Sequence, residues 1–221
     1  MKLAQAATQF PAYESDPSSG VPAPRGTDRT VEELRRENAR LRRTVAELET
    51  YRALAYRDAL TSLWNRRYFE ERLGQEISLA RRAPTGRFSL LVLDLNDLKR
   101  INDRDGHAAG DQALQRAAGF LRSRLREHDV CCRTGGDEFV VILRDLGPAE
   151  GAQLVARLRN ELLTANAGRE TPISLSMGVA SFPEDSTSAG ELCLRADEAM
   201  YEDKRRQKSL LTPAATLASE V

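Results

Sequence analysis

The residues of this sequence that could do chemistry are acidic and lie beside glycines. Asp137 and Glu138 follow Gly135 and Gly136, and a short apolar run upstream ends near Asp94. Glycines in a hairpin turn allow positive φ angles and a close approach of phosphate to the backbone. If the two segments are neighbouring strands, Asp94 and Asp137 meet at one edge of a sheet. Grouped carboxylates suit Mg²⁺, a hard cation that leaves part of its shell to water and phosphate oxygens.

The surrounding pattern predicts a sheet that could bring these acids together. Apolar runs and alternation indicate strands, and apolar spacings of three and four indicate helices. The expected order is helix 65–82, strand 87–95, helix 110–126, strands 130–133 and 139–143, helix 148–165, strand 173–181 and helix 188–206. This order predicts an α/β (α+β) fold, a mixed β-sheet flanked by helices and close to the split βαβ plan.

Composition narrows the class of protein. Lysine plus arginine and aspartate plus glutamate each number 33, so the net charge of zero does not favour nucleic acid as a partner. Three cysteines, two of them adjacent at Cys131 and Cys132, form neither a disulfide framework nor a metal site. No run approaches the roughly 20 apolar residues of a membrane span, and the first residues lack a signal-peptide core. We expect a cytoplasmic protein with reduced thiols and no membrane partner.

The residues before the globular part fall into two segments. Residues 1–27 are rich in Pro, Ser, Gly and Ala, which predicts a disordered tail. Residues 28–56 carry a heptad repeat whose a and d positions are Val31, Leu34, Asn38, Leu41, Val45 and Leu48. Leucine at d with valine at a favours a parallel two-stranded coiled coil, and a facing pair of asparagines at one a position fixes its register. The alternative is a single amphipathic helix lying on its own domain. The globular part is expected at residues 57–212, followed by a short tail at 213–221.

Taken alone, Gly-Gly-Asp-Glu is an ordinary solvated turn, and an aspartate ending a strand is usually a helix cap. Five motifs read together point further, because the chain resembles the GGDEF family of diguanylate cyclases from about residue 58 to residue 209. The segments that carry the resemblance are Asp58–Arg67, Asp94–Asp111, the signature hairpin Arg133–Phe139, Ser176–Ala180 and Asp197–Lys204.

The resemblance implies a role for each matching residue. Metal ligation would fall to Asp94, the Leu95 carbonyl, Asp137 and Glu138, which would hold two Mg²⁺ or Mn²⁺ ions per active site. Asp137 or Glu138 would also help to deprotonate the attacking 3′-hydroxyl of GTP, with Lys99 offsetting phosphate charge. The substrate-binding residues would be Asn102, His107 and Asp111 at the guanine, Gly135 and Gly136 at the hairpin, and Lys204 and Lys208 at the outer phosphates.

The resemblance also implies regulation and assembly. Arg126 and Asp129 form an RxxD motif where the family places an inhibitory site for its product, cyclic di-GMP. One domain would bind one GTP and the product contains two, so two domains must meet, and the coiled coil would hold the homodimer together. No complete sensor domain fits into residues 1–56, which leaves room for a regulatory partner protein.

Some positions depart from the family pattern. Ser62 and Trp64 replace more usual residues of the first motif, Asn96 stands where aspartate is common, and Asp97-Leu98 and Gln207-Lys208 replace other common pairs. Three alternatives to an active cyclase therefore stay open: a catalytically silent module that binds GTP or cyclic di-GMP, a different cyclase or nucleotidyl transferase, and a structural coiled-coil adaptor.

Overall fold

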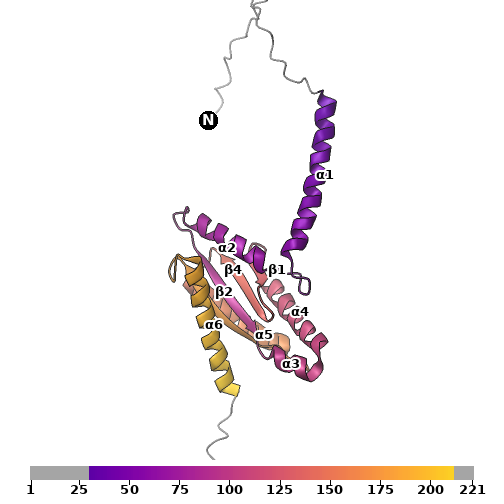
Figure 1. Cartoon of the computed structure of the whole chain (residues 1–221). Coiled ribbons are helices and arrows are strands. Elements are labelled where there is room, and N and C mark those ends of the chain that lie inside the picture. Colours follow the sequence, from indigo (N-terminus) through magenta and orange to yellow (C-terminus); the bar gives the residue numbers. More distant parts are fainter. Residues whose placement is uncertain (1–29, 212–221) are drawn as a thin grey trace, which may run out of the picture. The chain divides into compact units, whose positions relative to one another are not determined.

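The computed structural model describes residues 30–211, so the predicted tails at 1–27 and 213–221 lie outside the described residues. The chain divides after Leu48 into two units, residues 1–48 and 49–221. Helix α1 (Val31–Tyr56) begins in the first unit and ends in the second (Figure 1).

Helix α1 confirms the helix predicted before the globular domain. It begins at a capping box, in which the Thr30 amide donates to Glu33 Oε2 at 2.9 Å and the Glu33 amide donates to Thr30 Oγ1 at 3.3 Å. Its a and d side chains remain exposed, with Leu41 57% and Leu48 60% accessible. No helix among residues 30–211 is long and apolar enough to span a membrane.

The globular unit is built on a five-stranded sheet with the order β1-β3-β4-β2-β5. The strands are β1 (Trp64–Asn65), β2 (Phe88–Leu95), β3 (Val130–Arg133), β4 (Glu138–Arg144) and β5 (Leu175–Phe182). The other helices are α2 (Arg66–Ala80), α3 (Leu98–Asp105), α4 (His107–Arg124), α5 (Pro148–Asn166) and α6 (Ala189–Leu211). Because β4 is antiparallel to both β2 and β3, those two strands run parallel with β4 between them. This is the predicted split βαβ arrangement.

Two elements were not predicted from the sequence. Helix α3 has only eight residues, and Leu98 and Ile101, which are partly buried against the core, are its only apolar residues, a pattern too short to indicate a helix. Strand β1 has only two residues and is defined by parallel pairing of Trp64 with Cys132 and of Asn65 with Arg133. Both elements depend on contacts with distant parts of the chain.

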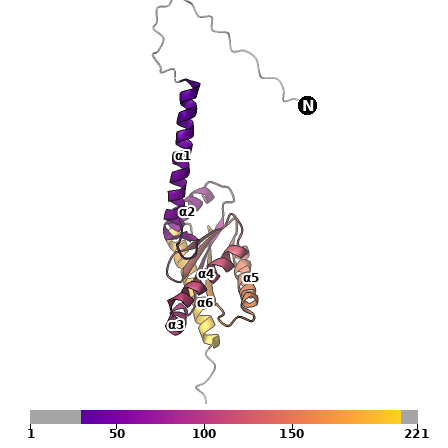
Figure 2. The same ribbon diagram turned by 90° about the vertical axis from the view of Figure 1, so that its right-hand side faces the viewer.

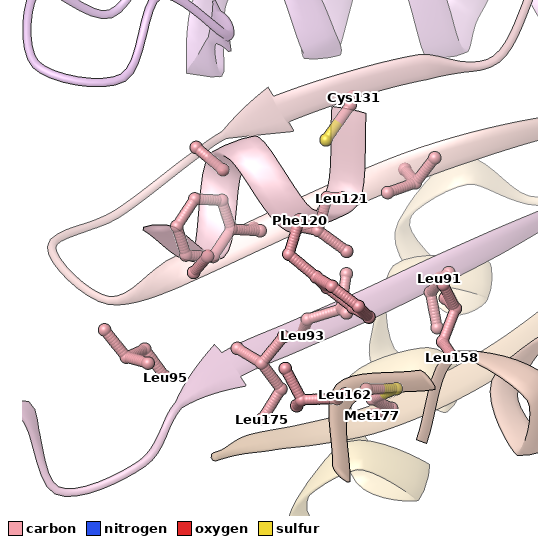
Figure 3. Close-up of a cluster of buried hydrophobic side chains, with 14 of the residues drawn as sticks. Leu91, Leu93, Leu95, Phe120, Leu121, Cys131, Leu158, Leu162, Leu175 and Met177 are labelled. Atoms are coloured by element: carbon pink, nitrogen blue, oxygen red, sulfur yellow. The ribbon is translucent and has the colours of Figure 1, made fainter. Parts of the chain in front are cut away.

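The core lies on both faces of the sheet, and β2 shows how it is divided. Leu91, Leu93 and Leu95 point toward α4 and α5, where they join the cluster shown in Figure 3. Leu90 and Val92 point to the other face, which α2 and α6 cover (Figures 1 and 2). The alternation follows from the two-residue period of a strand. It also places Asp94 on the α2/α6 face.

The two adjacent cysteines divide between the same two cores, Cys131 on the α4/α5 face and Cys132 on the α2/α6 face. Burial raises the pKa of Cys132 to about 12 and raises the pKa of Cys131 as well. Neither thiol therefore forms a reactive thiolate near neutral pH. Packing is their role, as expected.

Candidate functional site

The acidic residues singled out in the sequence lie at one end of the β2–β4 pair. Asp94 faces Glu138 across the two strands, and the Leu95 amide donates to the Asp137 carbonyl at 2.9 Å. This bond ties the turn of the β3–β4 hairpin to the end of β2. The condition set from the sequence, that these two segments be neighbouring strands, is thus met.

A lysine from the last helix completes this acidic edge. Asp94 is only 7% exposed, and Lys204 Nζ of α6 donates to its Oδ1 at 2.7 Å. A carboxylate removed from water is costly unless positive charge compensates it. The Asp94 carboxylate therefore needs a cation beside it, and in this structure the Lys204 ammonium is that cation.

The donor chemistry of this edge fits a divalent metal ion. Asp94, Asp137 and Glu138 offer hard carboxylate oxygens of the kind that Mg²⁺ and Mn²⁺ prefer. Asp94 is buried, whereas Asp137 is half-buried and Glu138 is exposed. Within the part of the chain that the structure describes, no three acidic, histidine or cysteine side chains are gathered closely enough to enclose an ion.

The glycines of the hairpin serve a different purpose from the one expected. Neither Gly135 nor Gly136 has φ in the left-handed region, so the expectation that these glycines supply positive φ was wrong. A Cβ at Gly135 would instead lie 2.7 Å from Glu138 Oε2. Gly135 leaves room for the Glu138 carboxylate to fold back over the turn, and Gly136 stays open to solvent.

The hairpin turn is also held by Arg133, a residue to which no role was assigned from the sequence. Its Nη2 donates to the Gly136 carbonyl at 2.8 Å, while Nη1 donates to the Asp58 carboxylate at 3.1 and 3.3 Å. Asp58 in turn accepts from the amide and the hydroxyl of Thr61 at 2.8 and 2.6 Å. The first motif of the domain and the signature turn therefore share one polar cluster.

The predicted guanine-binding residues lie on the corner between α3 and α4. Gly106 turns the chain with φ +83°, and its amide donates to the Asn102 carbonyl at 2.9 Å. A Cβ at Gly110 would lie 1.9 Å from Asn102 Oδ1, so the absence of a side chain there makes room for Asn102. The next residue, Asp111, is exposed. The structure thus brings Asn102 and Asp111 to the same corner.

The remaining predicted substrate contacts are on helix surfaces. Lys99 lies in the first turn of α3, His107 is the first residue of α4, and Lys208 lies one turn beyond Lys204 on α6. The side chains of Lys99, His107 and Lys208 are all exposed.

A cavity of about 410 Å³ lies on the α2/α6 face beside the hairpin. Its apolar wall includes Phe69, Leu90 and Val140, and its polar rim includes Glu138 and Asp197. The signature glutamate therefore borders both the acidic edge and this cavity.

The RxxD motif forms a tight turn before β3. The Arg126 amide donates to Asp129 Oδ2 at 2.9 Å, and the Asp129 amide donates to the Arg126 carbonyl at 3.1 Å. Both residues line a cavity of about 310 Å³ that is also lined by Glu150 and Arg157 of α5. Sequence reasoning missed Arg157 because it lies 31 positions after Arg126 and no local pattern links them.

Comparison with known proteins agrees with this architecture. Residues 55–209 match the family described as diguanylate cyclase, GGDEF domain. Diguanylate cyclase DgcP of Pseudomonas aeruginosa is 41% identical over 173 residues, which are 76% of this chain and 25% of that protein. The coiled coil and GGDEF domain of DgcB from Caulobacter crescentus, solved with cyclic di-GMP, has a TM-score of 0.68 at 28% identity and covers 79% of this chain and 94% of that one. Diguanylate cyclase SiaD of Pseudomonas aeruginosa, solved with its activator SiaC, has a TM-score of 0.66 at 30% identity, over 79% of this chain and 68% of that one.

A split βαβ sheet with acids on the β2 end and the adjoining hairpin defines a nucleotidyl-cyclase-like domain. The chain belongs to the GGDEF domain family of diguanylate cyclases. It spans less than half the length of the curated relatives it matches, for example 25% of DgcP and 34% of the response regulator PleD of Caulobacter vibrioides.

The Arg133 cluster yields a prediction for stability. Burial by itself raises the pKa of Asp58, but the bonds from Thr61 and Arg133 together hold that pKa below its ordinary value. A carboxylate whose pKa is lowered by folding stabilises the folded state at pH values above its unfolded-state pKa of about 4. This stabilisation is lost as pH falls through the folded-state pKa. Asp58→Asn should therefore lower the free energy of unfolding by about 1–3 kcal/mol at pH 7.

This difference should begin to shrink when urea unfolding is repeated below about pH 4, where Asp58 of the unfolded chain becomes protonated, and should vanish at a lower pH, where the folded protein is protonated as well. Asp105→Asn is the matched control, because Asp105 pairs with the neighbouring Arg104 on an exposed surface and should change stability little. Equal losses in the two variants, or a loss in Asp58→Asn that does not depend on pH, would show that Asp58 does not act through its charge.

Proposed function

We propose that this protein is a diguanylate cyclase that condenses two GTP molecules into cyclic di-GMP and two pyrophosphates across a homodimer. The observation that carries the proposal is the edge where Asp94, paired with Lys204, lies across from Glu138 in a chain that belongs to the GGDEF family. We expect it to act in the cytoplasm.

The reaction would be two displacements, one at each nucleotide. The 3′-oxygen of each GTP forms a bond to the α-phosphorus of the other, the bond from that phosphorus to the bridging oxygen breaks, and pyrophosphate leaves. Asp137 or Glu138 accepts the proton of the 3′-hydroxyl. Mg²⁺ or Mn²⁺, two ions held by Asp94, the Leu95 carbonyl, Asp137 and Glu138, would supply positive charge at the phosphate oxygens.

The lysines would place the triphosphate. Lys204 lies against Asp94 at 2.7 Å, so its ammonium is at the acidic edge, from which it would contact the outer phosphates. Lys208 lies one turn further along α6, and Lys99 would add charge from α3. Fixed positive charge at the leaving group stabilises a transition state without reorganisation of solvent.

The corner between α3 and α4 would select guanine. A carboxylate such as Asp111 accepts from both the N1–H and the 2-amino group of guanine, and adenine offers no such pair of donors. Asn102, placed by Gly110, would bind the same base, with His107 beside it. GTP is therefore the expected substrate, rather than ATP.

A glycine substitution tests this guanine site. Gly110→Ala should displace the Asn102 side chain and raise KM for GTP about fivefold, since one hydrogen bond to the base is worth about 1 kcal/mol. Alanine favours a helix over glycine by about 1 kcal/mol, so weaker helix formation cannot explain the change. Gly119→Ala on the same helix is the control, because its Cβ would meet nothing within 4 Å. An unchanged KM in Gly110→Ala would remove Asn102 from the site.

The exposed stripe of α1 supports assembly through a parallel coiled coil. Leu34, Leu41 and Leu48 are all more than half exposed in the single chain, and a second copy would cover them. The likeness to the DgcB structure, which comprises a coiled coil and a GGDEF domain, covers 79% of this chain, more than residues 55–209 alone provide. Pairing would raise the effective concentration of the second active domain. A protein activator, as in the SiaD complex, is one form that regulation could take.

Dilution of the enzyme tests whether the coiled coil holds the catalytic dimer together. Replacing Leu41 and Leu48 by glutamine should lower specific activity at least about tenfold at low enzyme concentration and much less at high concentration. Arg36→Gln with Arg43→Gln, at outward-facing f positions of the same heptads, should leave the concentration dependence unchanged. If the leucine variant keeps full activity on dilution, the coil does not hold the catalytic dimer.

We further propose that cyclic di-GMP inhibits the enzyme at the cavity of Arg126, Asp129 and Arg157. The two arginines line the same cavity as Asp129, whose Oδ1 is buried without a hydrogen-bond partner. Guanidinium groups bind phosphate or a guanine edge through two parallel bonds, and Asp129 would accept from guanine.

Arg126→Ala should raise the inhibition constant for cyclic di-GMP by about 10- to 100-fold while leaving the initial rate unchanged, since a charged hydrogen bond is worth about 1.5–3 kcal/mol. Arg169→Ala, which removes an exposed arginine bonded only to its own helix end, is the control. Product inhibition that persists in Arg126→Ala would place the inhibitory site elsewhere.

The proposal as a whole is tested by incubating the purified protein with GTP and Mg²⁺ and separating the nucleotides by chromatography, with ATP in a parallel reaction. We expect cyclic di-GMP from GTP and none in Asp137→Asn. A folded wild-type protein that binds GTP without forming product would instead be a silent module that signals by binding.

A further inference from the structure

We propose that Asn96 and Gln207 are positioning residues that hold the end of α6 on the sheet and thereby set Lys204 for the substrate. This inference rests on the proposed function. Both residues were singled out in the sequence as departures from the family pattern, and the structure joins them directly, with Asn96 Nδ2 donating to Gln207 Oε1 at 3.2 Å.

Residues Tyr201 to Leu210 give the end of α6 no buried attachment. The Met200 side chain is buried, whereas none of the side chains from Tyr201 to Leu210 is. Lys204 and Lys208 both belong to this end. An exposed helix end frays unless specific contacts hold it, so polar contacts must fix where these lysines lie.

Gln207 makes most of those contacts. Its Nε2 donates to the Leu175 carbonyl at 3.1 Å and to Asp203 Oδ2 at 2.8 Å. Its Oε1 accepts from Asn96 and from Ser174 Oγ at 3.1 Å. One side chain therefore links α6 to the end of β2 and to the start of β5.

Asn96 is fixed on the other side of this contact. The backbone amide of Asn96 donates to the Ser174 carbonyl at 2.9 Å, and its side-chain Oδ1 accepts from the hydroxyl of the fully buried Ser176. Asp94 lies two residues before Asn96, on β2. Ser176 is also the cross-strand partner of Asp94. The amide pair and the Lys204–Asp94 ion pair thus bridge the same two elements, one turn of α6 apart.

Asp203 extends the same attachment. It accepts from the Met177 amide at 2.9 Å and from Arg159 of α5 at 2.8 Å. Because Gln207 donates to this carboxylate, loss of Gln207 would loosen a cluster that includes the residue directly before Lys204. The groups at the Asn96 contact are neutral, so the lysines keep their positive charge for phosphate.

The expected consequence is a change in substrate affinity rather than in the chemical step. Asn96→Ala and Gln207→Ala should each raise KM for GTP about tenfold with kcat changed less than about twofold, since the lysines would be held less often in the binding position while the reacting groups stay in place. The double variant should be no worse than Gln207→Ala alone, because Asn96 acts on α6 through its bond to Gln207. Gln75→Ala, which removes an exposed glutamine bonded only within α2, is the control.

Rescue separates this contact from a general loss of structure. Asn96→Asp removes the donor and should raise KM, and adding Gln207→Lys should lower KM again, because a charge pair replaces the amide pair. Additive effects of the two alanine substitutions, or no rescue by the charge pair, would overturn the inference.

Hydrogen exchange gives a readout that does not depend on activity. In Gln207→Ala the amides of residues 204–211 and of Met177 should exchange faster, while those of the β2–β4 pair stay protected. Unchanged exchange at the end of α6 would overturn the positioning role even in an active enzyme. Faster exchange in a protein that makes no cyclic di-GMP would count against the proposed function alone.

Discussion

A carboxylate that is almost wholly shielded from water must be compensated by positive charge, and Asp94 places this requirement at the centre of the domain. The charge comes from Lys204, 110 positions later in the chain, at a distance of 2.7 Å. For that lysine to arrive, α6 must lie close to β5, and Gly178 allows this, since a Cβ there would lie 2.1 Å from the Met200 amide nitrogen. The packing of the last helix and the electrostatics of the acidic edge are therefore one arrangement.

The hairpin depends on a second polar constraint. Its turn is fixed on one side by the Leu95 amide and on the other by Arg133, which is itself held by Asp58. Asp58 follows α1 by two residues. The end of α1 is attached to α2 through Tyr56, whose hydroxyl donates to Glu71 at 2.5 Å. The last turn of α1 is thus held on α2, and the signature turn is held by Arg133 together with a residue two positions after α1.

Much of the fold and of the acidic edge could be predicted from the sequence, because these features depend on local sequence patterns. The strands that carry Asp94 and Glu138 are apolar runs, and Asp137 and Glu138 directly follow two glycines. The residues proposed to bind guanine were identified by motif, although α3 was missed because only Leu98 and Ile101 mark its inner side. What could not be predicted depends on pairs far apart in the chain: Arg157 beside Arg126, Arg133 with Asp58, and Gln207 with Asn96. The function of Gly135 was misjudged for a related reason, since its role is set by the Glu138 side chain and not by its own backbone angle.

None of the side chains from Tyr201 to Leu210 is buried, and this has a consequence for the function proposed above. Detaching this end of α6 exchanges polar contacts for contacts with water and exposes little apolar surface, so it costs far less than unfolding the domain. If Lys204 and Lys208 bind the triphosphate as proposed, they can release pyrophosphate while the sheet stays intact. The same helix end would then both bind the leaving group and let it go.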